Sequence, residues 1–135
     1  MLKTEEESVV PLSEEIAFAE KYTALLQERF TSGFAVQYDL PPQLLSRHIV
    51  PCALQLLIEN ATKHNIVSPE RPLTVQVRVE DDLLIVSNNL QPRISTHAST
   101  GVGLKNIRRQ YEDLANRSIR IVQTDTNFIV ELPLL

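Results

Sequence analysis

The sequence predicts an α+β domain, a two-layer sandwich in which helices cover one face of a mixed, mostly antiparallel sheet. Segments of helical and strand periodicity follow one another as helix, strand, helix, two strands, loop, helix and two strands. Too few strands are separated by helices for a doubly wound parallel sheet. The length of 135 residues and the 43% hydrophobic content suit one domain with its own core.

The first predicted helix follows an acidic start. Residues 1–12 have no apolar period, and we expect a disordered start or the end of a linker there. Ser13 is the expected N-cap, and Gly33 ends the segment. Residues 13–32 then hold either the last helix of a preceding region or the first helix of the domain. The apolar face of this helix consists of residues at helical spacing: Ile16, Ala19, Thr23, Leu26 and Phe30.

A strand and a second helix come next. The segment "FAVQYDL", Phe34 to Leu40, alternates like a strand and ends at Pro41-Pro42. The second helix runs from about Pro51, where proline suits the first turn, to about His64. Its apolar stripe recurs at i, i+3, i+4 and i+7: Leu54, Leu57, Ile58 and Ala61.

The middle of the chain predicts a hairpin and a long loop. The segments "LTVQVRVE" (73–80) and "LLIVSN" (83–88) read as strands joined by a turn at Asp81-Asp82. The next residues, 89–100, contain turn formers and have no period. A loop of that length inside a domain is usually functional or mobile.

The last third of the chain predicts a helix and two strands. The helix extends from Gly103 to about Asn116, and its apolar face holds Leu104, Ile107, Tyr111 and Leu114. The segments "SIRIVQT" and "NFIVELPL" then close the sheet.

Composition excludes several classes of function. The net charge of −4 argues against a general nucleic-acid binder, which needs clustered basic residues. No apolar run approaches the roughly 18 residues of a membrane span, and the acidic N-terminus has no apolar signal core. Cys52 is the single cysteine and cannot build a disulfide framework or a zinc site alone. A reducing, cytoplasmic setting is the default.

The second predicted helix ends in polar residues, "LLIENATKHN". At 100° per residue, Asn60, Lys63 and His64 fall on one side of the helix, with Glu59 beside them. An asparagine oxygen suits Mg²⁺, lysine and histidine meet phosphate oxygens, and a glutamate can orient or deprotonate a nucleophile. The alternative is an exposed helix end, where Lys63 and His64 complement the helix dipole.

The stretch "TGVGLKN", residues 100–106, holds two of the three glycines of the chain. Gly101 and Gly103 precede a helix whose free N–H groups suit a polyphosphate. The alternative is a hinge followed by an ordinary helix start. The stretch is neither a Walker loop nor a dinucleotide fingerprint, because the flanking residues of those motifs are missing.

Taken together, these stretches resemble the ATP-binding catalytic domain shared by histidine kinases, gyrase-type topoisomerases, Hsp90 and MutL, the Bergerat fold. The segments "VPLSEEIAFAEKYTALLQERF", "PCALQLLIENATKHN", "GVGLKNIRRQYEDL" and "FIVELPLL" look most like the LytS/YehU type of bacterial sensor histidine kinase. The resemblance covers Val10 to Leu135 and implies that residues 33–135 form the catalytic domain.

The resemblance implies roles for the polar end of the second helix. Asn60 would be the Mg²⁺ ligand and would contact ATP. Lys63 and His64 would contact phosphates, and Glu59 would position the attacking group or a water.

The resemblance also assigns the glycine-rich stretch. Gly101, Val102, Gly103 and Leu104 would offer backbone N–H groups to the phosphates, preceded by Thr100, and Lys105 and Asn106 would add side-chain contacts. The loop from Asn89 to Thr100 would be the ATP lid. Arg93 in that loop would reach a phosphate, with a solvated surface arginine as the alternative.

Two positions depart from the family pattern on the adenine side. Asn88 stands where the family has an aspartate that accepts from the adenine amino group, and Leu90 stands at the following glycine. The amide oxygen still accepts this hydrogen bond, but without the charge of a carboxylate the bond is weaker by about 1 kcal/mol. In the later "TDT" stretch, which replaces a glycine-rich signature, Thr126 supplies the remaining hydroxyl for the adenine side, or is simply a turn threonine.

The phosphoacceptor histidine of the family has no counterpart here. No segment like "HFLFN" is present, and His48 and His97 lie in predicted loops. The resemblance therefore implies a piece of a longer kinase, the cytoplasmic part of a membrane-anchored homodimer. It would bind Mg²⁺ and ATP, phosphorylate a histidine on the parent's acceptor helix and serve a response regulator. The alternatives are a degenerate, non-catalytic nucleotide-binding or dimerisation module and a stand-alone ATPase.

Overall fold

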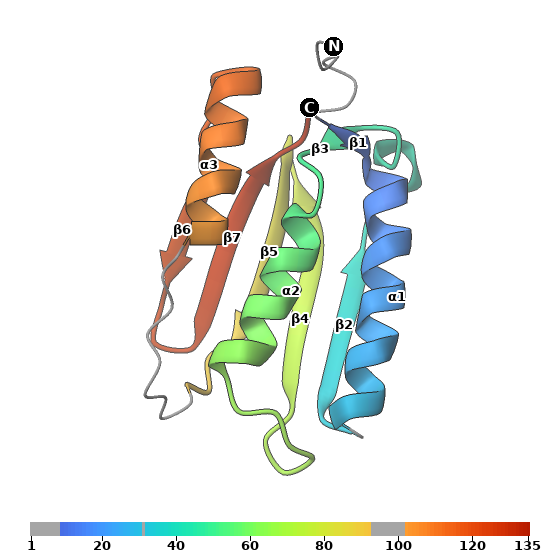
Figure 1. The fold of residues 1–135 in the computed structure, drawn as a ribbon, viewed down its shortest axis with the longest axis vertical. Helices are drawn as coiled ribbons and strands as arrows, with labels where there is room; N and C mark the ends of the chain where they lie inside the picture. Colours follow the sequence, from blue (N-terminus) through green and yellow to red (C-terminus); the bar gives the residue numbers. More distant parts are fainter. Residues whose placement is uncertain (1–8, 31, 93–101) are drawn as a thin grey trace.

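The computed structural model describes residues 9–30, 32–92 and 102–135. Three helices lie on one face of a five-stranded sheet with the order β2-β4-β5-β7-β6 (Figure 1). The helices are α1 (Leu12–Phe30), α2 (Ala53–His64) and α3 (Val102–Ala115). The strands of the sheet are β2 (Phe34–Asp39), β4 (Leu73–Glu80), β5 (Leu83–Asn89), β6 (Arg120–Gln123) and β7 (Asn127–Pro133).

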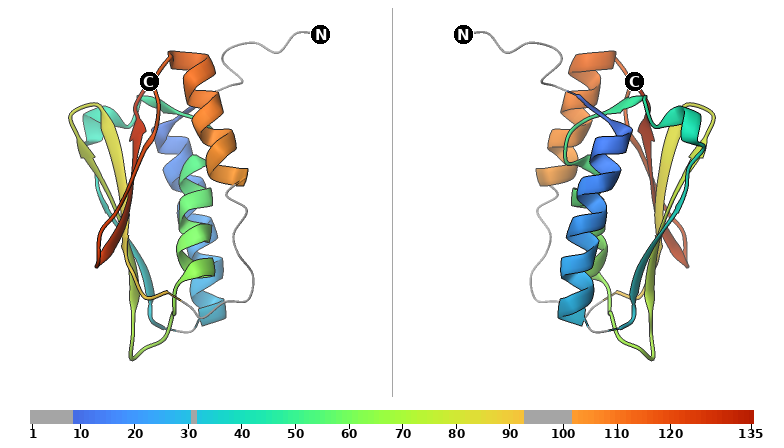
Figure 2. Two further views of the ribbon diagram at one scale, coloured as in Figure 1. Left: turned by 90° about the vertical axis from the view of Figure 1, so that its left-hand side faces the viewer. Right: turned by 90° about the vertical axis from the view of Figure 1, so that its right-hand side faces the viewer.

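Figure 2 shows the two layers edge on, with all three helices on the same side of the sheet. The strands β2 and β4 pair in parallel, and the other three pairs are antiparallel. The predicted fold class, helices on one face of a mixed, mostly antiparallel sheet, is confirmed. Within the described residues, no helix is both long enough and apolar enough to cross a membrane.

A second, two-stranded sheet joins β1 (Val10–Pro11) to β3 (His48–Ile49), and a 3₁₀ turn, η2, spans Pro42–Leu44. Val10 and Pro11 thus form a strand within residues 1–12, expected as a disordered start or the end of a linker, of which residues 1–8 lie outside the described residues. His48, expected in a loop, lies in a strand as well. The backbone groups of this sheet are paired: Leu12 N–H donates to the Arg47 carbonyl at 2.7 Å. His48 also exchanges two backbone hydrogen bonds with Leu135, at 2.9 and 2.8 Å.

The core lies between the helices and the sheet, and α1 shares it with the other two helices. Its members are buried apolar side chains: Leu12, Ala19 and Leu26 from α1; Leu54, Leu57, Ile58 and Ala61 from α2; Ile107 and Tyr111 from α3; and Leu73, Val75, Val77, Leu84, Val86, Val130 and Leu132 from the sheet. Leu114, expected on the buried face of α3, is exposed, because the end of α3 extends beyond the sheet (Figure 1).

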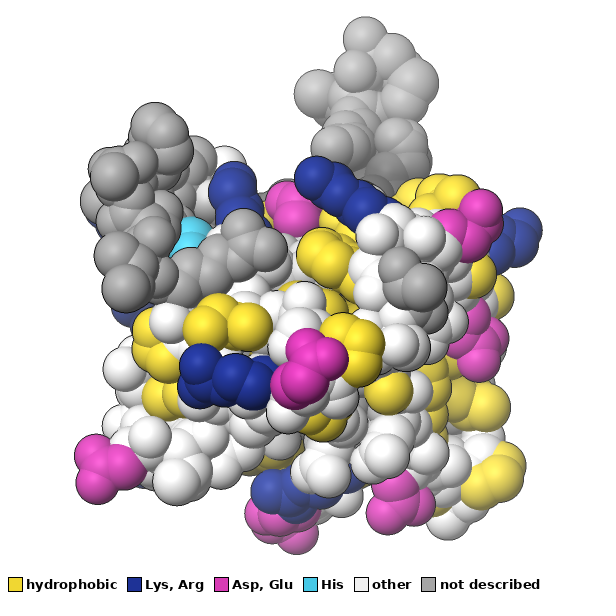
Figure 3. Space-filling view, turned by 90° about the horizontal axis from the view of Figure 1, so that it is seen from below, with side chains coloured by type: hydrophobic (Ala, Val, Ile, Leu, Met, Phe, Trp, Pro, Cys, Tyr) yellow, Lys and Arg dark blue, Asp and Glu magenta, His cyan; other side chains and the backbone are white. Residues whose placement is uncertain are grey.

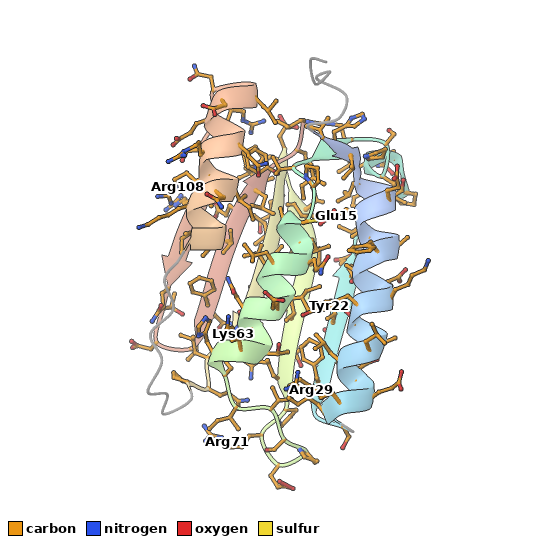
Figure 4. All side chains as sticks on the ribbon, in the orientation of Figure 1. Glu15, Tyr22, Arg29, Lys63, Arg71 and Arg108 are labelled. Atoms are coloured by element: carbon orange, nitrogen blue, oxygen red, sulfur yellow. The ribbon has the colours of Figure 1, made fainter. Side chains whose placement is uncertain are left out.

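The start of α2 is capped by a residue of α1. Cys52, which precedes α2, has a φ of 67°, and its own side chain makes no capping hydrogen bond. Instead, the backbone N–H groups of Cys52 and Leu54 each donate to the carboxylate of Glu15 at 3.1 Å. Glu15 is 5% exposed and points from α1 toward α2 (Figure 4). It thereby satisfies N–H groups that the first turn of a helix leaves without partners.

Gly33 allows the connection after α1 to touch the connection after α2. Its φ is 103°, and a Cβ placed there would lie 2.5 Å from the backbone carbonyl carbon and oxygen of Ser68. Its carbonyl accepts from Leu73 N–H at 2.7 Å, next to the start of β4. A side chain at position 33 would therefore collide with backbone that cannot move aside.

Gly103 allows α3 to approach α2 closely. A Cβ at position 103 would lie 2.8 and 2.9 Å from the two δ-carbons of Leu56. This contact brings the first turn of α3 against the middle of α2, so the glycine has a packing role that is independent of any ligand.

We expect the Glu15 carboxylate to make stability depend on pH. Burial raises the pKa of Glu15 above its ordinary 4.5, and this effect exceeds the lowering by the N–H groups of Cys52, Leu54 and Gln55. The folded protein therefore holds the proton to higher pH than the unfolded chain. The resulting stabilisation is complete below pH 4.5 and is lost as the pH rises through the folded-state pKa.

The measurement is urea denaturation in half-unit steps upward from about pH 4. Relative to Glu15→Gln, the free energy of unfolding of the wild-type protein should fall across this window. The matched control is Glu14→Gln, at the exposed neighbouring position. Equal pH slopes for the wild type and Glu15→Gln would contradict the prediction.

A double-mutant cycle tests the contact between Gly103 and Leu56. The change in the free energy of unfolding that Gly103→Ala causes should be more favourable by about 1 kcal/mol in a Leu56→Ala background than in the wild type. The shortened side chain at position 56 makes room for the new methyl group. The free energies come from urea denaturation without nucleotide. Leu25→Ala, at an exposed leucine of α1, provides a control background in which the effect of Gly103→Ala should not change.

Candidate functional site

A cavity of about 340 Å³ lies between the helices and the sheet. Residues of α2, of the end of β5, of the start of α3 and of β6 and β7 surround it. Its lining consists of Leu57, Asn60, Ala61, His64, Asn65, Val86, Asn88, Leu90, Pro92, Leu104, Gln123, Phe128 and Val130. Apolar side chains dominate this lining, and the amides and one imidazole are its polar groups.

Two of the predicted residues on α2 face this cavity. Asn60 and His64 are both half-buried and line it from the side of the helix that also carries Leu57 and Ala61. Residues four apart share a helix face, so the polar pair extends the apolar stripe toward the solvent.

Glu59 and Lys63 lie on another side of α2. Both are exposed and line a second cavity of about 340 Å³ between α1 and α2, together with Tyr22 and Arg29 (Figure 4). The Tyr22 hydroxyl donates to Glu59 Oε2 at 3.4 Å. Burial and the Glu59 carboxylate raise the pKa of Tyr22. The polar end of α2 is thus divided between two cavities.

Asn88 is the buried amide at the end of β5. It is 7% exposed, and its Nδ2 donates to the carbonyl of Asn89 at 2.9 Å. Within the described ranges, no donor reaches Asn88 Oδ1. The amide is therefore oriented with its oxygen as the acceptor still available at the cavity wall. Leu90, the other departure from the family pattern, also lines the cavity.

The start of α3 contributes Leu104 to the cavity lining, next to the contact of Gly103 with Leu56. Lys105 and Asn106 follow in the same helix and are exposed. Several predicted ATP-binding residues lie outside the described residues: Arg93, Thr100 and Gly101. Val102, expected to contact phosphate through its backbone N–H, is the first residue of α3.

Thr126 lies in the turn between β6 and β7, beside the cavity and not in its lining. Its hydroxyl donates to Asn127 Oδ1 at 2.9 Å. Its carbonyl accepts from Leu90 N–H at 2.8 Å and so ties this turn to the end of β5.

Phe128, Gln123 and Asn65 are among the lining residues that were not predicted from the sequence. Phe128 pairs directly with Asn88 on one side and with Gln123 on the other. The strand alternation of "NFIVELPL" puts Phe128 on the same face as Val130 and Leu132, which was a usable signal. Whether Gln123 lies beside Phe128 depends on the register between β6 and β7. The turn between these strands contains no glycine, so its sequence does not predict that register.

Gln91 joins the end of β5 to the end of α2. Its backbone N–H donates to Asn65 Oδ1 at 2.7 Å, and its carbonyl accepts from Ile66 N–H at 2.7 Å. Its side-chain Nε2 donates to the carbonyls of Ile66, Arg71 and Pro72 at 3.0, 2.9 and 3.3 Å. Asn65 Nδ2 donates in turn to Ala61, within α2, at 3.0 Å. We call this set of contacts the Gln91 clasp.

Figure 3 views the molecule from the end at which β5 ends and β7 begins. Lysine and arginine side chains alternate there with acidic and apolar ones. The described side chains visible in this view therefore form no large patch of a single charge.

The sequence is similar to sensor proteins named LytS. It is 29% identical over 121 residues to that of Staphylococcus haemolyticus, across 76% of this chain and 20% of the relative. The LytS proteins of Enterococcus faecalis and Bacillus subtilis are each 31% identical over 74 residues, which is 55% of this chain and 13% or 12% of theirs. The chain thus spans about a fifth or less of the length of these relatives. No protein-family model matches it.

Solved structures with the same fold include histidine kinases. The cytoplasmic segment of QseC has a TM-score of 0.61 at 17% identity, over 94% of this chain and 76% of that one. The catalytic domain of ThkA has a TM-score of 0.60 at 16% identity, over 93% and 95%. Acinetobacter baumannii AdeS has a TM-score of 0.57 at 13% identity, over 93% and 66%. The resemblance predicted from the sequence is confirmed: the chain is similar in sequence to the LytS sensor proteins and has the fold of histidine kinase catalytic domains.

Proposed function

We propose that this chain is the catalytic ATP-binding domain of a two-component sensor histidine kinase. It binds Mg²⁺ and ATP and donates the γ-phosphate to a histidine outside these 135 residues, for relay to a response regulator. The observation that carries the proposal is that Asn60 and His64 of α2, Asn88 of β5 and Leu104 of α3 all line the same cavity.

The cavity suits a nucleotide in size and chemistry. Its volume of about 340 Å³ is within the range of small-molecule sites, which are mostly apolar with a few polar groups. Leu57, Ala61 and Phe128 supply apolar walls for a base, and Asn88 Oδ1 supplies an acceptor for an exocyclic amino group.

Asn60 fits a magnesium ion bound together with phosphates. Mg²⁺ takes oxygen ligands, keeps several waters and is usually bound through one or two protein groups plus substrate phosphates. Among residues 9–30, 32–92 and 102–135, no group of three or more His, Cys, Asp or Glu side chains could hold a metal ion. An amide oxygen beside the phosphate path is compatible with the usual Mg²⁺–nucleotide arrangement.

The triphosphate would extend from the base toward the start of α3. Backbone N–H groups at a helix start attract anions, and Leu104 links that end of α3 to the cavity. We assign the phosphate contacts to Thr100, Gly101, Val102, Gly103, Leu104, Lys105 and Arg93, together with His64, and leave Thr126 on the adenine side. Glu59 and Lys63 line the other cavity, on the side of α2 that borders α1, so this assignment of phosphate contacts does not include them.

Phosphoryl transfer by such a domain would depend on placement and charge neutralisation. The acceptor histidine, the response regulator, a membrane anchor and a dimer contact would belong to a longer parent protein, with this domain in the cytoplasm. The LytS relatives, of which the matched region makes up 20% or less, support that view. The neutral Asn88 and the bulky Leu90 favour the second candidate, a nucleotide-binding module without catalysis.

Calorimetric titration with Mg-ATP tests the proposal. We expect binding by the wild type, a loss of at least tenfold in affinity for Asn60→Ala, and a smaller difference between the two proteins when EDTA removes Mg²⁺. Gln110→Ala, on the exposed part of α3, serves as the control and should bind like the wild type. No heat and no thermal shift for the wild type at millimolar Mg-ATP would refute nucleotide binding. Binding without phosphotransfer to a supplied acceptor segment would favour the non-catalytic module.

Asn88→Asp should increase the affinity for Mg-ATP and lower the stability of the protein without nucleotide. A carboxylate would accept from the adenine amino group through a charge-assisted bond, so Mg-ATP should bind about fivefold more tightly at pH 8. The same change replaces the Nδ2 donor with an oxygen facing the Asn89 carbonyl, so the free energy of unfolding without nucleotide should fall by about 1 kcal/mol. Titration calorimetry and urea denaturation measure the two effects. Weaker Mg-ATP binding by Asn88→Asp would contradict the expected contact.

A further inference from the structure

Three residues form a row across the floor of the cavity. In the strand register, Asn88 of β5 pairs with Phe128 of β7, and Phe128 pairs with Gln123 of β6. Directly paired residues of antiparallel strands project their side chains from the same face of a sheet. All three line the cavity, so the shared face is the one that the helices cover.

The row presents two amides with a phenyl ring between them. Neighbouring strands are about 4.8 Å apart, so the backbones of Asn88 and Gln123 are separated by about 10 Å. A planar base can lie over Phe128 in that interval, with one edge toward each amide. Across the described ranges, no hydrogen bond engages the side chain of Gln123, which is exposed and free to turn toward a ligand.

We propose that Gln123 is a base-contacting specificity residue, which donates from Nε2 to a ring nitrogen of a purine whose amino group donates to Asn88 Oδ1. The proposal rests on the nucleotide binding proposed above and adds a second polar contact to it. Ring nitrogens of a purine are acceptors, and the amide of glutamine supplies the donor that they need.

The fixed orientation of Asn88 decides which edge of the base it accepts. Because Nδ2 donates to the Asn89 carbonyl, the amide is held in one orientation and Oδ1 is its acceptor toward the ligand. A base with a carbonyl group at that edge would oppose oxygen to oxygen, whereas an amino group forms a hydrogen bond. Neither amide carries a charge, so two neutral contacts share the recognition of the base that one carboxylate would otherwise dominate.

The test compares Mg-ATP with magnesium tripolyphosphate, which lacks the base. By titration calorimetry, Gln123→Ala should bind Mg-ATP about fivefold more weakly, the loss expected for one hydrogen bond, and tripolyphosphate as the wild type does. Gln123→Glu keeps the shape but cannot donate, so it should lose as much. Gln76→Ala, at an exposed glutamine on the other face of the sheet, is the matched control and should change neither affinity.

The outcomes separate this inference from the proposed function. A wild type that binds no Mg-ATP overturns the proposed function and the role of Gln123 with it. A wild type that binds Mg-ATP, with Gln123→Ala equal to it or equally weakened for both ligands, overturns the role of Gln123 alone. Full affinity in Gln123→Glu would also overturn the assigned donor.

Discussion

The N–H groups of Cys52 and Leu54 at the start of α2 donate to the buried carboxylate of Glu15, and the geometry of the cavity depends on this contact. The helix that it holds in place has two duties. One stripe of α2 packs into the core, and the adjoining stripe carries Asn60 and His64 at the cavity. A shift of α2 along the sheet would disturb the core packing and the positions of Asn60 and His64 at once. Because Glu15 of α1 caps α2, the position of the first helix affects the site.

Much of the fold followed from periodicity in the sequence. The stripe of α2 at i, i+3, i+4 and i+7 and the alternating valines of β4 are long enough to identify their elements and their buried faces. Asn60, Asn88 and Leu104 were assigned to one site through the resemblance to the Bergerat ATP-binding domain, and all three line the same cavity.

Other features depend on contacts between distant segments, which local patterns do not encode. The two-residue strands β1 and β3 are too short for a period and exist through pairing with each other and with Leu135. In the sequence, Glu15 looks like an ordinary acidic residue in the first turn of a helix, and its capping role is seen only where α2 packs beside α1. The separation of Glu59 and Lys63 from Asn60 and His64 depends on where α1 packs, because neighbouring helical positions can border different cavities.

The Gln91 clasp has a mechanical consequence. Because one residue bonds to Asn65, Ile66, Arg71 and Pro72, the exit of β5 and the connection that leaves α2 cannot separate without breaking five hydrogen bonds. Two of them come from the backbone of Gln91 and three from its side chain. In the language of hydrogen exchange, the two segments form one cooperative unit that opens together. A displacement of one segment is therefore passed to the other, so the part of the cavity rim that these two segments form moves as one unit.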